Sequence, residues 1–433
     1  MQLNSINTLT TECKANAMRS QNYILALITL PALLISHPLL AVPSNPPASS
    51  ALCDNPIIPV GSLATLPSLL PIGSSNEADR KDLELRDRVL QLAASGQVSQ
   101  ALQVAQTIEK EIWKISAMRG IAVELTASGQ VSQALQVVQG IEDESGKYWT
   151  LFDMAVKLAE AGQVEQALQV AQTVEKDSWK TGVLEGIAVK LVETGQLEQA
   201  LQLAQTIEDT RSIAVKLAEI GHLEQALQLA QSIKDGHAKS WALHDIAGKL
   251  LEAAQVSQSL QVTQTIKGCY QKASVLLKIA AQYQVAKQTD KVLPILAQTL
   301  PIAQAIESVN WKAQTLAMIA RQYREAGQGD RVLPILSDAL EVAQALKAAN
   351  WKAQVLTKIA GEYREAGQGD RVLPILSAAL QSAQAIEIDF FKASALREIA
   401  DEYRKAGQEE QASEILSQAE ELVARRPTLQ RSP

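Results

Sequence analysis

The chain has 433 residues, with 40 basic and 47 acidic side chains and a formal net charge of −7. Apolar residues make up 47%, which disfavours disorder. Only six Trp, seven Tyr and three Phe are aromatic, which disfavours a strand-rich fold. The basic residues do not outnumber the acidic ones, so the chain as a whole lacks a nucleic-acid footprint. The abundant Ala, Leu, Gln, Glu and Lys favour helices, so we predict an all-α protein. From the charge balance we predict that it does not bind nucleic acid.

Residues 1–41 are predicted to be a signal peptide. Lys14 and Arg19 precede an uncharged apolar stretch at residues 23–35, and Ala41 offers a small residue for cleavage. The alternative is an uncleaved N-terminal membrane anchor, and translation could start at Met1 or at Met18. We expect an exported protein, in the periplasm, the cell envelope or outside the cell. It would touch a membrane only through an uncleaved N-terminal segment.

Residues 42–79 are predicted to be an extended linker. Seven prolines lie among Ser, Asn and Gly residues there, a composition that does not pack into a regular element. At the other end, residues 425–433 are expected to form a disordered tail. Residues 80–424 remain for the folded body.

The folded body is built from repeats. The phrase Gly-Gln-Val-x-Gln-Ala-Leu-Gln-Val and its variants recur at spacings of 33, 33, 33, 26, 33, 33, 40, 40 and 40 residues. Each copy has one turn position; these are Gly96, Gly129, Gly162, Gly195, Gly221, Ala254, Lys287, Gly327, Gly367 and Gly407. Both departures from 33 equal seven residues, almost two helical turns, so they keep an apolar stripe facing the same way. The spacing therefore predicts helix pairs, each turning at a left-handed residue. Asn310, Asn350 and Ser178 are expected to cap first helices.

The repeats resemble the tetratricopeptide (TPR) family. Its Leu-Gly-x-x-Tyr…Gly pattern maps onto Ile319-Ala320, Tyr323 and Gly327 and onto their counterparts, in repeats of 33 and 40 residues. The resemblance covers residues 80–424. It implies a right-handed α-α superhelical solenoid of about ten helix pairs, with a concave groove that holds peptides or proteins.

A lysine column runs through the copies, fifteen residues before the turn position. Its members are Lys114, Lys147, Lys180, Lys239, Lys272, Lys312, Lys352 and Lys392. One interpretation is a ladder of ion pairs to the acidic end of the preceding helix, at Glu109, Glu142, Glu175, Glu307 and Glu387. The other is a basic stripe that binds an anionic polymer, such as a cell-surface or cell-wall polysaccharide.

The tryptophans follow the same spacing. Trp113, Trp179, Trp311 and Trp351 lie sixteen residues before the turn and are expected to pack between repeats. Trp149 and Trp241 lie thirteen before it, and the resemblance places them in the groove as anchors. The remaining candidates for the partner-binding groove are Phe152, His244, Arg321, Arg324, Arg364, Arg397 and Arg404. For the arginines, the alternative is scattered surface charge.

No catalytic constellation stands out. His237, His244 and Asp245 offer too few ligands of known spacing for a metal, and Cys269 is interpreted as a lone thiol. Nucleophile-elbow, Walker and dinucleotide-binding motifs are absent from the sequence. We therefore expect a non-enzymatic scaffold without cofactor or metal, which binds a peptide or protein partner. The alternative is the binder of an anionic polymer.

Overall fold

The computed structural model describes residues 77–424, which form twenty α-helices and no strand. The predicted signal peptide, most of the predicted linker and the predicted tail lie outside the described residues. The first described helix begins at Glu77, inside the expected linker. The twenty helices form ten consecutive pairs with tetratricopeptide-like spacing, so the all-α prediction and the count of ten pairs are confirmed.

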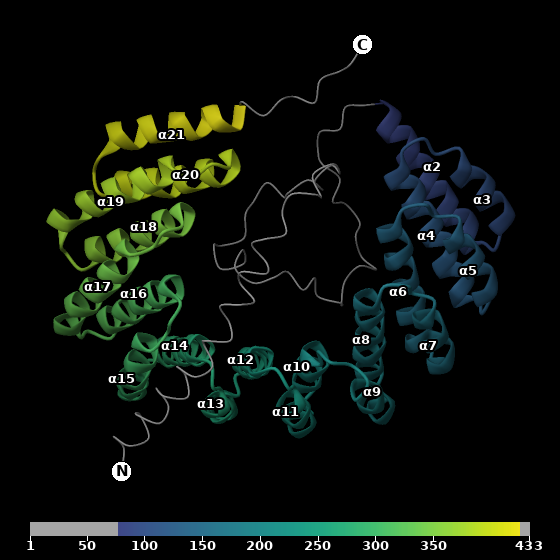
Figure 1. The fold of residues 1–433 in the computed structure, drawn as a ribbon, viewed down its shortest axis with the longest axis horizontal. Helices are drawn as coiled ribbons and strands as arrows, with labels where there is room; N and C mark the ends of the chain where they lie inside the picture. The colour runs from purple at the N-terminus through teal and green to yellow at the C-terminus, as the bar shows by residue number, and fades with distance from the viewer. Residues whose placement is uncertain (1–76, 425–433) are drawn as a thin grey trace. The chain divides into compact units, whose positions relative to one another are not determined.

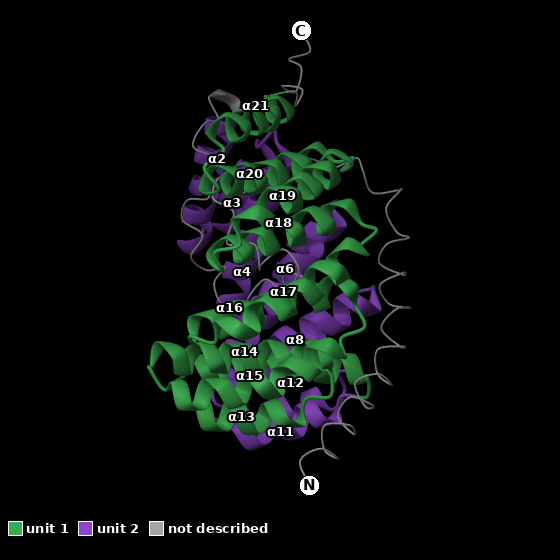
Figure 2. Ribbon diagram, turned by 90° about the vertical axis from the view of Figure 1, so that its left-hand side faces the viewer, with its two compact units in different colours: residues 1–30, 234–433 green, residues 31–233 purple. Residues whose placement is uncertain are grey.

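The described chain divides into two compact units (Figure 2). The first in sequence order, drawn in purple in Figure 2, spans residues 77–233 of the described chain. Its first helices are α2 (Glu77–Ala94), α4 (Glu111–Ala127), α6 (Glu144–Glu160), α8 (Asp177–Glu193) and α10 (Arg211–Glu219). Its second helices are α3 (Val98–Gln106), α5 (Val131–Gln139), α7 (Val164–Gln172), α9 (Leu197–Ala204) and α11 (Leu223–Ser232). Each first helix contacts the next one along the unit. The first helices thus form one layer, and the second helices pack against one side of that layer (Figure 1).

The second unit, residues 234–424, repeats this arrangement. Its first helices are α12 (Gly236–Glu252), α14 (Cys269–Val285), α16 (Val309–Glu325), α18 (Ala349–Glu365) and α20 (Asp389–Lys405). Its second helices are α13 (Val256–Thr265), α15 (Thr289–Gln304), α17 (Gly329–Gln344), α19 (Gly369–Gln384) and α21 (Glu409–Ala424). In each unit we call the side formed by the first helices, away from the second helices, the first-helix face.

The change from 33 to 40 residues lies in the second helix. Helices α5 and α7 have 9 residues, whereas α17 and α19 have 16, which is the seven-residue step seen in the repeat spacing. The short 26-residue copy instead has a first helix, α10, of 9 residues. Because seven residues make almost two turns, both changes preserve the direction of the apolar stripe.

Every helix pair turns through a left-handed residue. The eight turn glycines have φ between 73° and 89°, as predicted, and Ala254 and Lys287 adopt the same conformation at 58° and 56°. The backbone bonds are those of a Schellman motif: the Gln97 amide donates to the Leu92 carbonyl, and the Gly96 amide donates to that of Ala93. The turn satisfies carbonyls that the helix end would otherwise leave without partners.

The core follows the predicted stripe. In the fourth copy Ile187, Leu191, Ala200 and Ala204 are at most 1% exposed. The small alanines allow first and second helices to approach closely, which is why few aromatic residues are needed. No described helix is long and apolar enough to cross a membrane.

Candidate functional site

An aromatic cluster lies on the first-helix face of the first unit, where α6 meets α8. Trp149 and Phe152 of α6 lie together, with ring centroids 5.8 Å apart. Tyr148 connects them to Trp179 of α8. The Tyr148 ring centroid lies 4.9 Å from that of Trp149 and 5.1 Å from that of Trp179. The Lys176 ammonium lies 3.9 Å from the centre of the Trp179 ring. The structure thus brings two predicted groove residues into one cluster.

Two glycines on α8 make room for this cluster. A Cβ at Gly182 would lie 2.8 Å from the Tyr148 hydroxyl, and one at Gly186 would lie 2.6 Å from a ring carbon of Phe152. The Phe152 ring is therefore packed against the α8 backbone. Trp149 is half-buried, and its ring is not packed against a glycine of α8. Trp149 is therefore better placed than Phe152 to contact a partner.

Polar groups border the cluster between α8 and α10. The Ser212 hydroxyl of α10 donates a hydrogen bond to the Glu185 carboxylate of α8. Burial raises the pKa of Glu185, and this outweighs the bond from Ser212. Burial, together with the nearby Glu185, also raises the pKa of Tyr148. On the α4 side, Arg119 forms an ion pair with Asp153 of α6.

A second set of charges was not singled out from the sequence. Lysines five residues before the turn position pair with glutamates three residues later on the same helix: Lys157–Glu160 at 2.8 Å, Lys190–Glu193 at 2.6 Å and Lys216–Glu219 at 2.9 Å. Lys216 also reaches Glu193 at 3.0 Å, which joins α10 to α8. The recurring Lys-Leu-x-Glu pattern in these copies was the signal that could have revealed them.

In the second unit the aromatic side chains form a row across the first helices. Trp241 of α12 lies 5.9 Å from Tyr270 of α14, Tyr270 lies 4.4 Å from Trp311 of α16, and Trp311 lies 6.3 Å from Trp351 of α18. All four rings are half-buried. We call these four residues the aromatic row. It confirms that Trp311 and Trp351 pack between repeats, and it adds Trp241, which was predicted to be a separate groove anchor.

His244 has a structural environment. It is 9% exposed, its Nδ1 lies 2.9 Å from Asp245 Oδ1, and its Nε2 lies 3.4 Å from Ser274 Oγ. Its ring packs edge-on against Trp241 at 5.3 Å. The structure therefore brings the predicted pair Trp241 and His244 together, with the histidine more deeply buried than the tryptophan.

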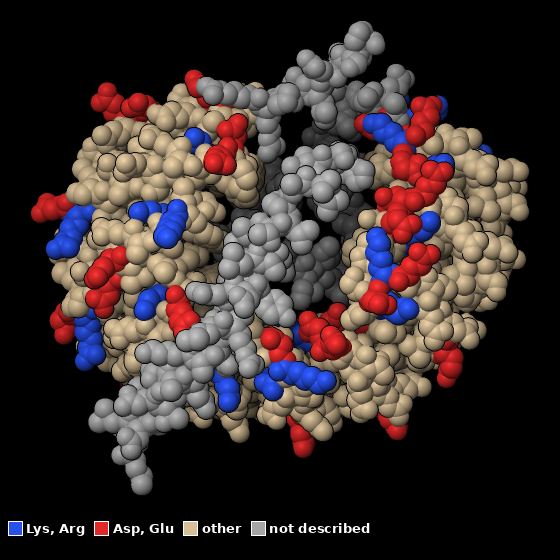
Figure 3. Space-filling view, viewed as in Figure 1, with Lys and Arg blue, Asp and Glu red and all other residues tan. Residues whose placement is uncertain are grey.

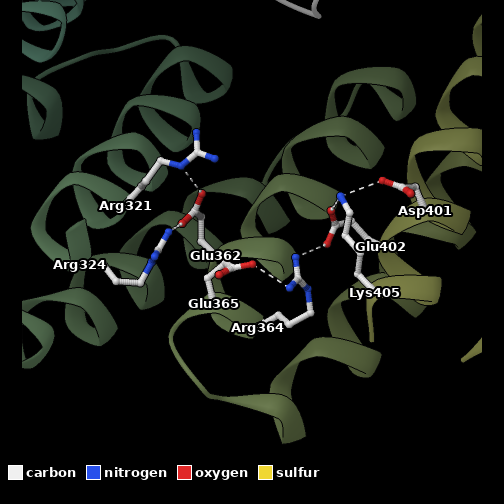
Figure 4. Close-up of polar contacts among 8 residues, drawn as sticks. All are labelled: Arg321, Arg324, Glu362, Arg364, Glu365, Asp401, Glu402 and Lys405. Atoms are coloured by element: carbon white, nitrogen blue, oxygen red, sulfur yellow. Dashed lines mark hydrogen bonds and ion pairs between the residues drawn. The ribbon is translucent and has the colours of Figure 1, made fainter. Parts of the chain in front are cut away.

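Three of the predicted groove arginines pair with acids of the next first helix (Figure 4). Arg321 and Arg324 of α16 both reach Glu362 of α18, at 3.1 Å and 3.4 Å. Arg364 of α18 reaches Glu402 of α20 at 3.4 Å. We call the Arg324–Glu362 and Arg364–Glu402 pairs the arginine ladder. Burial raises the pKa of Glu362 despite both arginines.

The two remaining arginines of the predicted groove lie on α20. Among residues 77–424, Arg404 pairs with Asp401, at 3.9 Å, and with Glu409, at 3.6 Å, and its side chain is 45% exposed. Arg397 is exposed, and no ion pair joins it to another residue within the described chain. These two keep the positions best suited to meet an acidic partner.

Two lysines of the lysine column meet the end of the preceding helix, but the acidic partners expected for the column were wrongly predicted. Within residues 77–424, no ion pair joins a column lysine to any of the five glutamates expected to form the ladder. Lys272 instead donates to the Gln264 carbonyl at 2.9 Å, and Lys352 donates to the Gln344 carbonyl at 2.8 Å. Both carbonyls belong to the last turn of the preceding helix, where a cation complements the helix dipole.

Charge on the face drawn in Figure 3 is intermixed. Acidic and basic side chains alternate there without forming a large patch of one sign. Among residues 77–424, no group of three or more His, Cys, Asp and Glu side chains could hold a metal ion. Cys269, interpreted from the sequence as a lone thiol, is disulfide-bonded, so that interpretation is wrong.

Comparisons with known proteins give only structural likenesses. No protein-family model matches the chain, and neither does any curated protein. A putative kinesin light chain of Podosopora anserina with nearly identical TPR-like repeats is 16% identical, with a TM-score of 0.29, over 57% of this chain and 96% of its own. The apo form of RapI is 12% identical, with a TM-score of 0.31, over 79% and 98%. A signal transduction ATPase with a tetratricopeptide repeat sensor from Pyrococcus horikoshii is 13% identical, with a TM-score of 0.34, over 74% and 52%.

Proposed function

We propose that this array of tetratricopeptide-like helix pairs is an exported, non-enzymatic scaffold that holds a peptide or protein partner against its first-helix face. The observation that carries the proposal is the position of Trp149, half-buried among aromatic neighbours and bordered by charges of both signs. Aromatic anchors surrounded by polar groups are the usual binding hot spots of protein interfaces. Intermixed charge also suits a protein partner better than a polymer of one sign.

The site is tested by partner capture with matched tryptophan variants. Trp149→Ala removes the anchor, whereas Trp113→Ala removes a tryptophan that packs under Arg86, 5.5 Å from its ring. Proteins captured and crosslinked from the envelope fraction are compared by quantitative mass spectrometry. We expect Trp149→Ala to weaken capture about 30-fold, which corresponds to a hot spot of about 2 kcal/mol, and Trp113→Ala to leave it unchanged. Equal capture by the wild type and Trp149→Ala would overturn the site.

The anionic-polymer hypothesis is distinguished by salt. At about 0.5 M salt, exposed charges are screened beyond roughly 4–5 Å, so polymer binding through lysines would be lost. Binding anchored by aromatic contacts should persist. Capture that disappears in salt and is unaffected by Trp149→Ala would favour the polymer.

Export is tested by the N-terminus of the protein isolated from its own cells. Cleavage after Ala41 gives a chain that begins at Val42. A mature chain that still begins at Met1 or Met18 and sediments with membranes would show an uncleaved anchor instead.

A further inference from the structure

A short motif recurs on two neighbouring first helices of the second unit. The residues Asn-Trp-Lys-Ala-Gln stand at 310–314 on α16 and again at 350–354 on α18. The lysine is the one charged residue of the motif, and on α18 it is Lys352, which donates to the Gln344 carbonyl at 2.8 Å. The uncharged ring and amide residues of the two copies we call the neutral strip: Asn310, Trp311, Gln314, Asn350, Trp351 and Gln354.

The tryptophans of the neutral strip belong to one aromatic surface. Their ring centroids lie 6.3 Å apart, and the ring of Tyr270 on α14 lies 4.4 Å from that of Trp311. Both tryptophans are half-buried, so part of each ring remains open. On α20 the same place in the copy holds Phe391, which is 44% exposed. Aromatic surface therefore recurs on consecutive first helices.

Amide side chains lie beside both rings. Gln314 lies one helical turn after Asn310 and donates to its Oδ1 at 3.3 Å. On α18, Asn350 is exposed and Gln354 is half-buried. An amide side chain offers two donors and one acceptor oxygen without carrying a charge. Because α16 and α18 pack against each other, a ligand that crosses both rings meets amides from both helices.

We propose that the neutral strip binds an uncharged, β-linked polysaccharide. The apolar C–H faces of pyranose rings stack on aromatic side chains, and their hydroxyl groups donate to and accept from amides. Neither kind of contact uses a charge, which matches the uncharged residues of the strip. A β-linked glucan chain is straight and presents its sugar faces one after another, as rings on consecutive helices require. The site goes beyond the protein-binding function proposed above and depends neither on Trp149 nor on export.

The first experiment measures binding of cellohexaose to the full chain by isothermal titration calorimetry. We expect saturable binding that Trp351→Ala weakens at least about tenfold and that Trp351→Phe largely retains, because phenylalanine keeps a ring. Gln354→Ala should weaken binding several-fold through lost hydrogen bonds to hydroxyl groups. Trp113→Ala, in the other unit, is the matched control and should bind like the wild type. Circular dichroism confirms that each variant is folded.

The absence of saturable binding to cellohexaose would overturn the proposal. Equal affinity of the wild type, Trp351→Ala and Gln354→Ala would overturn the assignment to the neutral strip. Maltohexaose, whose α-linked chain coils, should bind more weakly, and equal binding would refute the preference for a straight chain. At about 0.5 M salt the affinity should be unchanged, whereas its loss would indicate recognition by charge.

The second experiment distinguishes a polysaccharide from a peptide at the same place. Oxidative footprinting records the labelling of Trp311 and Trp351 in the full chain, alone and with saturating cellohexaose or a proline-rich peptide. We expect cellohexaose to lower the labelling of both tryptophans several-fold and to leave Trp113 unchanged. Protection by the peptide with none by cellohexaose would assign the neutral strip to a protein partner and overturn the proposal.

Discussion

The turn at Ala254 provides a quantitative test of why glycine recurs at the repeat turns. Its φ of 58° lies in the left-handed region, where a Cβ costs roughly 1–2 kcal/mol. Ala254→Gly removes that cost, but glycine also raises the conformational entropy of the unfolded chain, which lowers the free energy of unfolding by about 0.4–1 kcal/mol. We therefore expect a net gain of about 0.5–1 kcal/mol in the free energy of unfolding.

The preceding residue provides a matched control. Ala253 is also exposed, but its φ is −81°, so glycine there relieves nothing. Ala253→Gly should lower the free energy of unfolding by roughly 0.5–1 kcal/mol. Urea unfolding followed by circular dichroism measures both changes, and hydrogen exchange in α12 and α13 locates them. If both variants lose stability by similar amounts, left-handed strain does not explain the turn glycines.

Two further predictions concern the α6–α8–α10 region. Gly186→Ala places a Cβ 2.6 Å from the Phe152 ring and should lower the free energy of unfolding by about 1–3 kcal/mol. Gly248→Ala, on α12 with no atom within 4 Å, should raise it by up to about 1 kcal/mol, and opposite shifts in melting temperature would check this. Burial raises the pKa of Glu185, so its ionisation opposes folding and stability is lost as pH rises through that pKa. Glu185→Gln should therefore stabilise the protein more near about pH 7 than near about pH 4, and a pH-independent effect in urea unfolding would contradict this.

The repeat spacing was sufficient to predict the fold. A glycine at a fixed place in each copy indicated the left-handed turn, and the same geometry at Ala254 and Lys287 shows that the backbone keeps it even where the sequence is degenerate. The seven-residue steps were predicted to be helical turns, and they appear as longer second helices. Periodicity specifies these features because each copy must bury the same stripe.

Side-chain partners were less predictable. Asn310, Asn350 and Ser178 were expected to be N-caps, but each is the second residue of its helix. The side-chain caps that the structure shows are Asp143 and Asp235. A helix start is defined by backbone geometry within one or two residues, a finer scale than the repeat pattern resolves.

The charged sites show the same limit. The arginines were predicted as groove candidates, but the partners of Arg324 and Arg364 lie 38 residues further along the chain, and the sequence analysis did not single them out. Two lysines of the column, Lys272 and Lys352, reach the end of the preceding helix, but their acceptors are backbone carbonyls, which the sequence pattern does not reveal. Only a structure shows these pairings.

The arginine ladder also bears on how the gene can change. The segment from α18 to α19 contains both halves of the ladder, since Glu362 accepts from the copy before and Arg364 donates to the copy after. A tandem duplication of this 40-residue segment would give every new glutamate an arginine and every new arginine a glutamate. Recombination between these similar copies can therefore lengthen or shorten the array without leaving a half-buried charge unpaired.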